Sequence, residues 1–133
     1  MQVKVVTPDA SYFDGEAEAV FLPAWDGEIG VLPRHAPLIA RLGHGVARVT
    51  TKGEQSVRVA VYGGFVKVQD DVVTVLAGGA AKPQGDKAAA QKALDAAQGE
   101  LTKAREAGLP AAEVAGLEER VRRARAFVQL LAH

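Results

Sequence analysis

The chain has 133 residues, 48% of them hydrophobic, and its 16 basic and 16 acidic residues cancel at pH 7. This length fits one domain, or one compact domain with a small appendage, and the apolar content is enough to form a core. The lack of cysteine excludes disulfides and thiolate metal ligands. Because the chain is neutral, it has no overall electrostatic field that would attract nucleic acid.

The part of the chain up to about residue 82 has the hydrophobic pattern of short strands. Val57, Val59 and Val61 alternate with residues of the opposite face, as expected for a half-buried strand. Further strands are expected at residues 2–6, 16–22 and 37–42. About seven or eight strands with no helical interruption predict a small antiparallel sandwich or flattened barrel.

Two hairpins are predicted within this strand-rich part. Residues 46–62 form the first, with its turn at Lys52 and Gly53, because glycine accepts the positive φ of tight hairpin turns. Residues 65–77 form the second, with its turn at residues 69–71. Paired strands of this kind leave few open sheet edges.

After "AGGAAKPQG" the composition changes to alanine, lysine, glutamate, arginine and leucine. Asp86 is placed to cap a helix that continues to Ala107, and Gly108 and Pro110 end this helix and begin a second one. We therefore expect a segregated α+β protein, with a β-sandwich domain over residues 1–83 and an antiparallel two-helix hairpin over residues 84–133.

Each predicted helix has one apolar seam. The seam of the first helix is Ala90, Leu94, Ala97, Leu101 and Ala104, and the seam of the second is Val114, Leu117, Val121, Ala124, Val128 and Leu131. The alanines bury little area, and at about 25 cal/mol per Å² such a seam holds two helices together weakly. We expect an arm that can open and exchange its own partner for another surface.

The sequence offers no catalytic or metal-binding constellation. His35, His44 and His133 lack metal-ligand spacing, and Ser11 and Ser56 lie in no recognisable nucleophile turn. No segment reaches the roughly 18 apolar residues of a membrane-spanning helix, and the N-terminus has no signal-peptide pattern. We expect no catalytic site, no cofactor or metal, and no direct membrane insertion.

Four arginines form the strongest charge feature of the chain: Arg120, Arg122, Arg123 and Arg125. One explanation is that cations near a helix C-terminus are favoured by the helix dipole. Four arginines in six residues exceed that need, and no acidic residue follows them. An acidic protein partner is the better interpretation, because the patch is short and the whole chain is neutral.

Two strings identify a resemblance that covers essentially the whole chain. They are "DGEIGVLPRHAP" at residues 26–37 and "GGFVKV" at residues 63–68. Together with the helical hairpin, they closely resemble the epsilon subunit of bacterial F-type ATP synthases. The resemblance implies a sandwich of about ten strands and two helices. It also implies a non-catalytic rotor subunit on the cytoplasmic face of the bacterial plasma membrane.

The resemblance assigns contact roles to the first string. Its first part would meet the c-ring, through Asp26, Gly27, Glu28, Ile29 and Gly30. Its second part would contact the γ subunit, through His35, Ala36 and Pro37. Glycines let the backbone turn and prolines limit its freedom, which suits a rigid contact surface. For His35 a purely structural role, with its hydrogen bonds satisfied inside a turn, remains an alternative.

For the arm, the resemblance implies regulation of ATP hydrolysis. The extended arm would contact acidic segments of the catalytic β subunits through Arg120, Arg122, Arg123 and Arg125. Some relatives bind ATP in the folded arm through an (I/L)-D-x-x-R-A motif and two further arginines. Here Asp86 is present, but Ala89 replaces the motif arginine and Phe127 replaces one of the others. We therefore predict weak or absent ATP binding.

A second hypothesis belongs to another functional class. The chain could be a free-standing adaptor that binds one protein with its sandwich and another with its helical hairpin. Recovery together with γ and the other synthase subunits would favour the rotor subunit over the adaptor.

Overall fold

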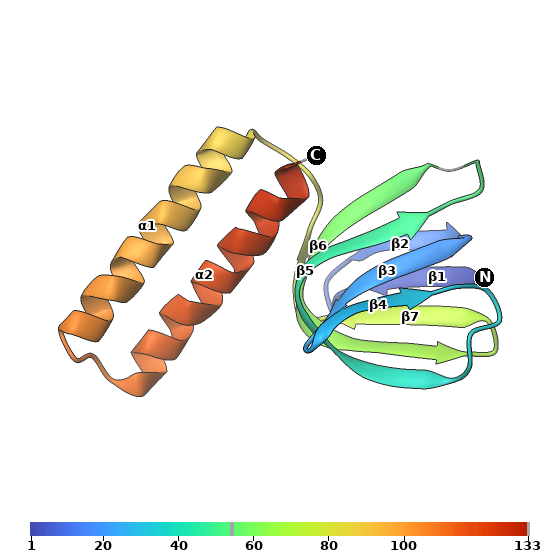
Figure 1. Ribbon diagram of the computed structural model, residues 1–133, viewed down its shortest axis with the longest axis horizontal. Coiled ribbons are helices and arrows are strands. Elements are labelled where there is room, and N and C mark those ends of the chain that lie inside the picture. Colours follow the sequence, from blue (N-terminus) through green and yellow to red (C-terminus); the bar gives the residue numbers. More distant parts are fainter. Residues whose placement is uncertain (54, 133) are drawn as a thin grey trace.

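The computed structural model describes residues 1–53 and 55–132, and it contains a β-sandwich followed by a helical hairpin (Figure 1). The segregated α+β fold is therefore confirmed. His133, one of the three histidines considered as metal ligands, lies outside the described residues.

The strands are β1 (Gln2–Val6), β2 (Ser11–Glu16), β3 (Ala19–Ala24), β4 (Gly27–Val31), β5 (Leu38–Thr50), β6 (Ser56–Gln69), β7 (Val72–Ala77) and β8 (Ala80–Ala81). The helices are α1 (Lys87–Glu106) and α2 (Ala111–Leu131). The predicted strand at residues 16–22 is confirmed over residues 19–22 as part of β3, but its start is wrong, because Glu16 ends β2 and β3 begins at Ala19.

The sheet has the strand order β2-β1-β7-β6-β5-β3-β4, and β8 pairs with β6. Most neighbours are antiparallel, but β1 pairs with β7 in parallel, with Val3 opposite Val73. The expectation of a wholly antiparallel sandwich is corrected at this pair. The N-terminal strand joins the sheet beside the last long strand, and both run in the same direction.

The described residues form eight strands and not about ten, because β5 and β6 are long and each changes the face that it buries. In β6, Val59 and Val61 are buried before Tyr62, whereas Val66 and Val68 are buried after Gly64. The buried positions thus change from odd-numbered to even-numbered residues, whereas in a regular strand with a period of two they would stay the same. The strand must kink between these segments, and one strand then serves both layers.

Glycines make these kinks possible. Gly63 and Gly64 have φ values of 72° and 112°, which favour glycine. In the paired strand β5, a Cβ on Gly43 would lie 2.9 Å from the Ala24 carbonyl oxygen, and one on Gly45 would lie 2.8 Å from Pro23 Cβ. The glycines of both strands therefore coincide with the place where the sheet folds over.

Both predicted hairpins are confirmed. The first turns beyond Thr50, where Gly53 has a φ of 89°. The second has a two-residue turn at Asp70 and Asp71, with φ values of 52° and 62°. Positive φ at both central positions is the geometry of a type I′ turn, which aspartate tolerates better than most residues.

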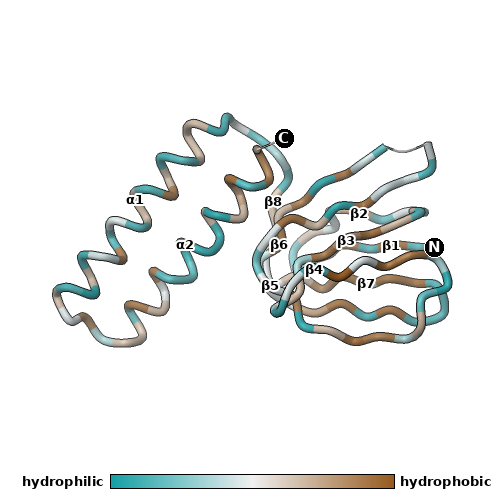
Figure 2. Tube along the Cα trace, in the orientation of Figure 1, coloured by the Kyte–Doolittle hydropathy of each residue, from teal (hydrophilic) through white to brown (hydrophobic). Residues whose placement is uncertain are grey.

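The core of the sandwich is formed mainly by valine side chains. It includes the buried residues of β1, β3, β5, β6 and β7, among them Val3, Leu22, Val49, Val61 and Val75. No residue of α1 or α2 belongs to this cluster. The sandwich therefore has an apolar core of its own (Figure 2).

The helical hairpin has a second, smaller core. Leu94, Ala97, Leu101 and Val121 form it, and the other predicted seam residues of α2 pack against it as far as Val128. Asp86 caps α1 as predicted, because its Oδ1 accepts a hydrogen bond of 2.7 Å from the Ala89 backbone N–H. The helix ends before Gly108, which has a φ of 67°.

Candidate functional site

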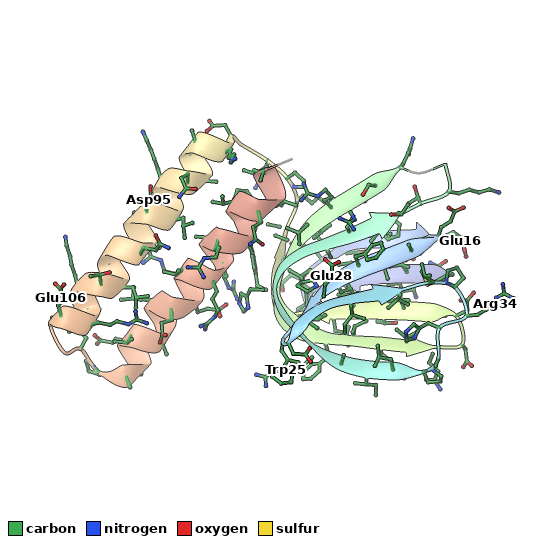
Figure 3. The ribbon with its side chains drawn as sticks, viewed as in Figure 1. Glu16, Trp25, Glu28, Arg34, Asp95 and Glu106 are labelled. Carbon is green, nitrogen blue, oxygen red and sulfur yellow. The ribbon has the colours of Figure 1, made fainter. Side chains whose placement is uncertain are left out.

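The string at residues 26–37 does not form one loop. Asp26 lies in the turn between β3 and β4, and Gly27 to Gly30 belong to β4, which is the edge strand of the sheet. Residues 32–37 form a loop at the other end of β4. The residues predicted to contact the c-ring therefore lie in the β3–β4 turn and along β4, and those predicted to contact γ lie in the loop beyond the end of this strand, as the positions of Glu28 and Arg34 indicate (Figure 3).

The side chains of β4 alternate between the two faces of the sheet. Glu28 is exposed, whereas Ile29 packs against the sandwich core. A Cβ on Gly30 would lie 3.1 Å from the Phe21 ring, so this glycine gives the ring room. Of the five predicted c-ring residues, Glu28 has the side chain best placed to meet a partner, and Ile29 is the least available.

Trp25 at the tip of this hairpin is a feature that the sequence reasoning missed. Its side chain is 71% exposed, and its backbone N–H donates a hydrogen bond of 3.2 Å to the Arg41 carbonyl. An exposed indole at a strand turn is typical of residues that anchor protein contacts. Its position directly before Asp26, the first residue of the predicted c-ring contact, could have indicated this exposed side chain.

The loop at residues 32–37 is held from outside by the β6–β7 turn. The Arg34 backbone N–H donates a hydrogen bond of 2.8 Å to Asp71 Oδ1, and Arg34 itself has a positive φ of 64°. A ring nitrogen of His35 lies 2.7 Å from the Ala36 carbonyl oxygen, and His35 is half-buried. The local bond agrees with a structural role for His35, while Ala36 and Pro37 are exposed.

Next to this loop the outer face of the sheet carries exposed apolar side chains. Ile39 lies on β5, Phe65 on β6 and Leu76 on β7, and Phe65 is opposite Leu76 in the register. Exposed large apolar side chains on strands that already have a buried core are a feature of protein-binding surfaces. It gives the predicted γ contacts an apolar neighbour.

The arm packs against the sandwich through α2, and α1 lies on the far side of α2 (Figure 1). Ala126 and Leu130 of α2 are 2% and 1% exposed and belong to neither core cluster. Ala60 of β6 is also buried, and it faces away from the core residues Val59 and Val61. These residues form a thin apolar contact between arm and sandwich.

Glu119 of α2 is the polar centre of this contact. Its Oε2 lies 2.8 Å from His44 Nε2 on β5 and 2.7 Å from Arg123 Nε on its own helix. Burial of the carboxylate raises its pKa, but hydrogen bonds and charge from Arg123 and His44 outweigh burial and lower the pKa to about 2. Glu119 therefore joins the helix to the sheet as a carboxylate.

Arg123 also lies against the sandwich. Its guanidinium carbon is 5.0 Å from the centre of the Tyr62 ring, which is the geometry of a cation–π contact. Gly79 leaves space for this contact, because a Cβ there would lie 3.1 Å from the Tyr62 ring and 3.3 Å from an Arg123 nitrogen. Burial raises the pKa of Tyr62, while the charge of Arg123 opposes the rise.

The C-terminal end of α2 is held by Arg58 of β6. Its Nη1 donates a hydrogen bond of 2.9 Å to the Leu130 carbonyl, and its Nη2 donates one of 3.4 Å to the Gln129 carbonyl. The last turn of α2 contains no basic residue of its own. Arg58 therefore supplies the cation that a helix C-terminus favours.

The four predicted contact arginines differ in their surroundings. Arg120 pairs with Glu100 of α1 at 2.7 Å, Arg122 with Glu119 at 3.4 Å, and Arg123 with Glu119 at 2.7 Å. Among the residues that the structure describes, Arg125 has no ion-pair partner. In the docked arm this basic patch is partly neutralised, because acidic residues before the run and on α1 pair with three of the four arginines.

His44, Arg58, Tyr62 and Glu119 are interface residues that the sequence reasoning did not select. They come from segments far apart in the chain, and no local spacing brings them together. A partial signal was present in Ala126 and Leu130, which form a second apolar stripe on α2 beside the one that faces α1.

The described residues contain no group of three histidine or acidic side chains close enough to share a metal ion. Within the same residues, neither helix is apolar enough over its length to cross a membrane. The arrangement consists of surfaces and a clamped arm, which can bind and position other proteins.

Comparisons with known proteins give one family. The model of the family described as ATP synthase, Delta/Epsilon chain, beta-sandwich domain, matches residues 1–83. An ATP synthase epsilon chain from Cyanothece sp. is 37% identical over 130 residues, which cover 97% of this chain and 93% of that relative. Another, from Alkalihalophilus pseudofirmus, is 44% identical over 95 residues, covering 69% of this chain and 71% of the relative.

Solved structures share the fold. A chain in the Euglena gracilis mitochondrial ATP synthase, solved as OSCP/F1/c-ring in rotational state 1, superposes with a TM-score of 0.81. It is 22% identical, and the match covers 98% of this chain and 80% of that chain. At this identity the likeness shows the fold, including the helical hairpin beside the sandwich.

Proposed function

This chain belongs to the ATP synthase delta/epsilon chain family, and we propose that it is a non-catalytic rotor subunit of a proton-translocating F-type ATP synthase. The observation that carries the proposal is the match to an epsilon chain over 97% of this chain, helical arm included. In this role the sandwich, residues 1–83, couples γ to the c-ring, and the arm, residues 84–133, regulates hydrolysis. Other subunits hold the chain at the cytoplasmic face of the bacterial plasma membrane.

The β3–β4 hairpin is the proposed c-ring contact. Glu28 points away from the core at the sheet edge, and Trp25 and Asp26 form the exposed tip. Gly27 and Gly30 add no side chains to the strand, while Ile29 packs against the core. An edge strand fixed by its neighbours transmits force better than a free loop, because its backbone is hydrogen-bonded to β3.

The loop with His35, Ala36 and Pro37, together with the apolar face around Phe65, is the proposed γ contact. Arg34 is fixed to Asp71 through its backbone N–H, so the loop is ordered before it binds. Ordered contacts lose less entropy on association than flexible ones. The exposed apolar side chains beside it supply the area that such an interface buries.

The arm is the proposed inhibitory element. When it leaves the sandwich, Arg120, Arg122, Arg123 and Arg125 would meet acidic segments of the catalytic β subunits. Arg125 lacks an ion-pair partner among the described residues, and the bonds of Arg120 and Arg122 are exposed ion pairs that cost little to exchange. Charge complementarity would make inhibition sensitive to salt.

ATP binding by the docked arm is proposed to be weak or absent. The Asp86 carboxylate already caps α1, and Arg123 is already bonded to Glu119 and stacked on Tyr62. Ala89 and Phe127 provide no guanidinium for a triphosphate. Titration of the whole chain with ATP in the millimolar range measures this affinity by calorimetry.

Co-purification tests the rotor assignment against the free-standing adaptor. A tagged chain expressed in its own host is expected to recover γ and the other synthase subunits. Phe65→Ser should weaken recovery of γ, because it removes an exposed apolar side chain from the proposed interface. Trp25→Ala is the control, since it removes another exposed aromatic, at the tip of the β3–β4 hairpin and outside the proposed γ contact. Recovery of unrelated proteins without γ would favour the adaptor.

A further inference from the structure

We propose that Glu119 is the latch residue that holds the arm against the sandwich, and that its bond to His44 sets the balance between docked and released arm. The latch adds a specific residue contact to the regulatory role proposed above. Only its effect on hydrolysis by the synthase rests on that proposed function. The latch itself is a property of the isolated chain.

The first argument is which contacts cross the interface. Glu119 to Arg123 is a contact within α2 and survives release of the arm. Among the described residues, the polar contacts that join arm to sandwich are Glu119 to His44, Arg123 to Tyr62, and Arg58 to the end of α2. The first of these is the one side-chain hydrogen bond between a carboxylate on the arm and a group on the sheet.

The second argument is the path of α2 over the sheet. Arg58, Ala60 and Tyr62 share the outward face of β6, where Arg58 meets Leu130 and Tyr62 meets Arg123. Because the earlier strand residue meets the later helix residue, α2 runs antiparallel to β6. Seven helical residues span about 10 Å and four strand residues about 13 Å, so the two segments are similar in length and the helix covers Ala60 between them. His44 lies opposite Tyr62 in the register, which places the bond to Glu119 beside the same contact.

The third argument is charge. Two clefts, of about 470 and 690 Å³, flank the contact between α2 and the sheet. Their lining contains five arginines: Arg41, Arg48, Arg58, Arg122 and Arg125. Within the described lining the carboxylates are Glu28 and Glu119 alone. Arginines from arm and sandwich would repel one another without an acid between them, and Glu119 is the acid contributed by the arm.

The fourth argument is that the arm is a separable unit. The hairpin and the sandwich have distinct core clusters, and the interface between them buries small residues such as Ala60 and Ala126. The connecting residues 82–86 are exposed, and Gly85 has a φ of 79°. Leu130 is the large apolar side chain buried beside these alanines, so few apolar side chains join the units, and a polar contact can shift the docking equilibrium.

Thiol labelling tests the latch directly, because the chain has no native cysteine. In an Ala60→Cys background the thiol is covered by α2, so its labelling rate reports the fraction of released arm. We expect Glu119→Gln to increase this rate about tenfold, as loss of a charged hydrogen bond predicts. His44→Ala should do the same, and the double variant should match the singles instead of multiplying them.

Glu118→Gln is the matched control. Glu118 is the adjacent acid on α2, but it pairs with Arg105 of α1 at 3.2 Å and leaves the sandwich contact intact. Its labelling rate should stay within about twofold of the parent. Equal rates for Glu118→Gln and Glu119→Gln, or full multiplication of the two latch variants, would overturn the proposal.

A second readout guards against an effect of the Ala60→Cys background. Spin labels at Lys52→Cys and Lys92→Cys, both exposed positions, report the distance between sandwich and arm. Glu119→Gln should add a population of longer distances while the sandwich keeps its thermal unfolding midpoint. If this variant releases the arm but leaves hydrolysis by the assembled synthase unchanged, the latch stands and the inhibitory role fails. If the arm stays docked, the latch fails whatever happens to hydrolysis.

Discussion

Gly64 is the residue whose replacement the sandwich tolerates least. It has a φ of 112°, and a Cβ there would overlap the Leu76 carbonyl oxygen in the paired strand β7. Both strain and steric overlap oppose any side chain, so Gly64→Ala should lower the free energy of unfolding by about 3 kcal/mol or more. Urea denaturation measures the loss.

Gly99→Ala is the matched control for Gly64→Ala. Gly99 lies in the middle of α1, and a Cβ there meets nothing within 4 Å. Alanine has the higher helix propensity, so this variant should gain about 0.5 to 1 kcal/mol. If both variants lost stability equally, the strained kink in β6 would not be the cause.

Glu119 gives the arm a dependence on acid pH. Burial raises the pKa of Glu119, but the bonds from Arg123 and His44 outweigh burial and lower the pKa from 4.5 to about 2 in the folded chain. The lowered pKa stabilises the folded chain fully above pH 4.5, and this stabilisation is lost as the pH falls through about 2. Only the part contributed by His44 belongs to docking, because the contact with Arg123 lies within α2. The side chain is 34% exposed, so solvent screening limits the effect to about 1 kcal/mol.

The groups that face Glu119 come from three elements. His44 lies on β5, Tyr62 on β6, and Arg122 and Arg123 on α2. A carboxyl-carbon NMR titration should show one signal that titrates near pH 2 and disappears in Glu119→Gln. Arm contacts should weaken over the same pH range, and a Glu119 signal that titrates near pH 4.5 would contradict the bonded carboxylate.

At the scale of elements, the sequence predicted the helices better than the edge strands. Asp86, Gly108 and the two seams determine the hairpin through local rules, because capping and helical period act within a few residues. The edge strand β4 was not among the expected strands, since its glycines and the surrounding prolines are also the residues of turns. The change of buried face along β6 was visible in the valine positions, but its cause lies in the paired strands.

The candidate site shows the same limit. Glu28 and the arginines of α2 could be selected because each lies in a distinctive local run. His44 could not, because its partner Glu119 is 75 positions away. Glu119 precedes the arginine run by one residue, and only the packed arm shows that it neutralises part of the run while bonding the sheet.

Helix α1 depends on its cap. Asp86→Ala removes the acceptor for the Ala89 backbone N–H, and the first turn of α1 contains no other acidic residue. The loss should be about 1 kcal/mol, confined to the hairpin. Hydrogen exchange should quicken in the first turns of α1 and stay unchanged in the core strands.

Asp95→Ala is the comparison for this cap. Asp95 accepts a hydrogen bond of 3.0 Å from Gln91 on the exposed side of the same helix. Such a surface pair contributes only about 0.2 to 0.5 kcal/mol, so exchange at the start of α1 should remain near the parent rate. Equal effects from both variants would argue against capping.

At the scale of the whole molecule, two unequal cores explain how one chain can combine a stiff contact surface with a movable arm. The valine core of the sandwich contains no helical residue, and the hairpin core contains no strand residue. The contact between them consists of a few buried apolar side chains and of polar bonds such as Glu119 to His44, with basic residues on both sides of it. Docking can therefore be reversed without unfolding either part.

A chain that ends at Lys82 tests this separation. It keeps every residue of the sandwich core and loses both helices, so its strands should retain their circular dichroism and unfold cooperatively. The newly uncovered Ala60 and Tyr62 should lower its stability by only about 1 kcal/mol, since the area involved is small. In the assembled synthase, hydrolysis should rise because the inhibitory arginines are absent. Unchanged hydrolysis with the shortened chain bound would remove the inhibitory role, and an unfolded shortened chain would mean that sandwich and arm form one cooperative unit.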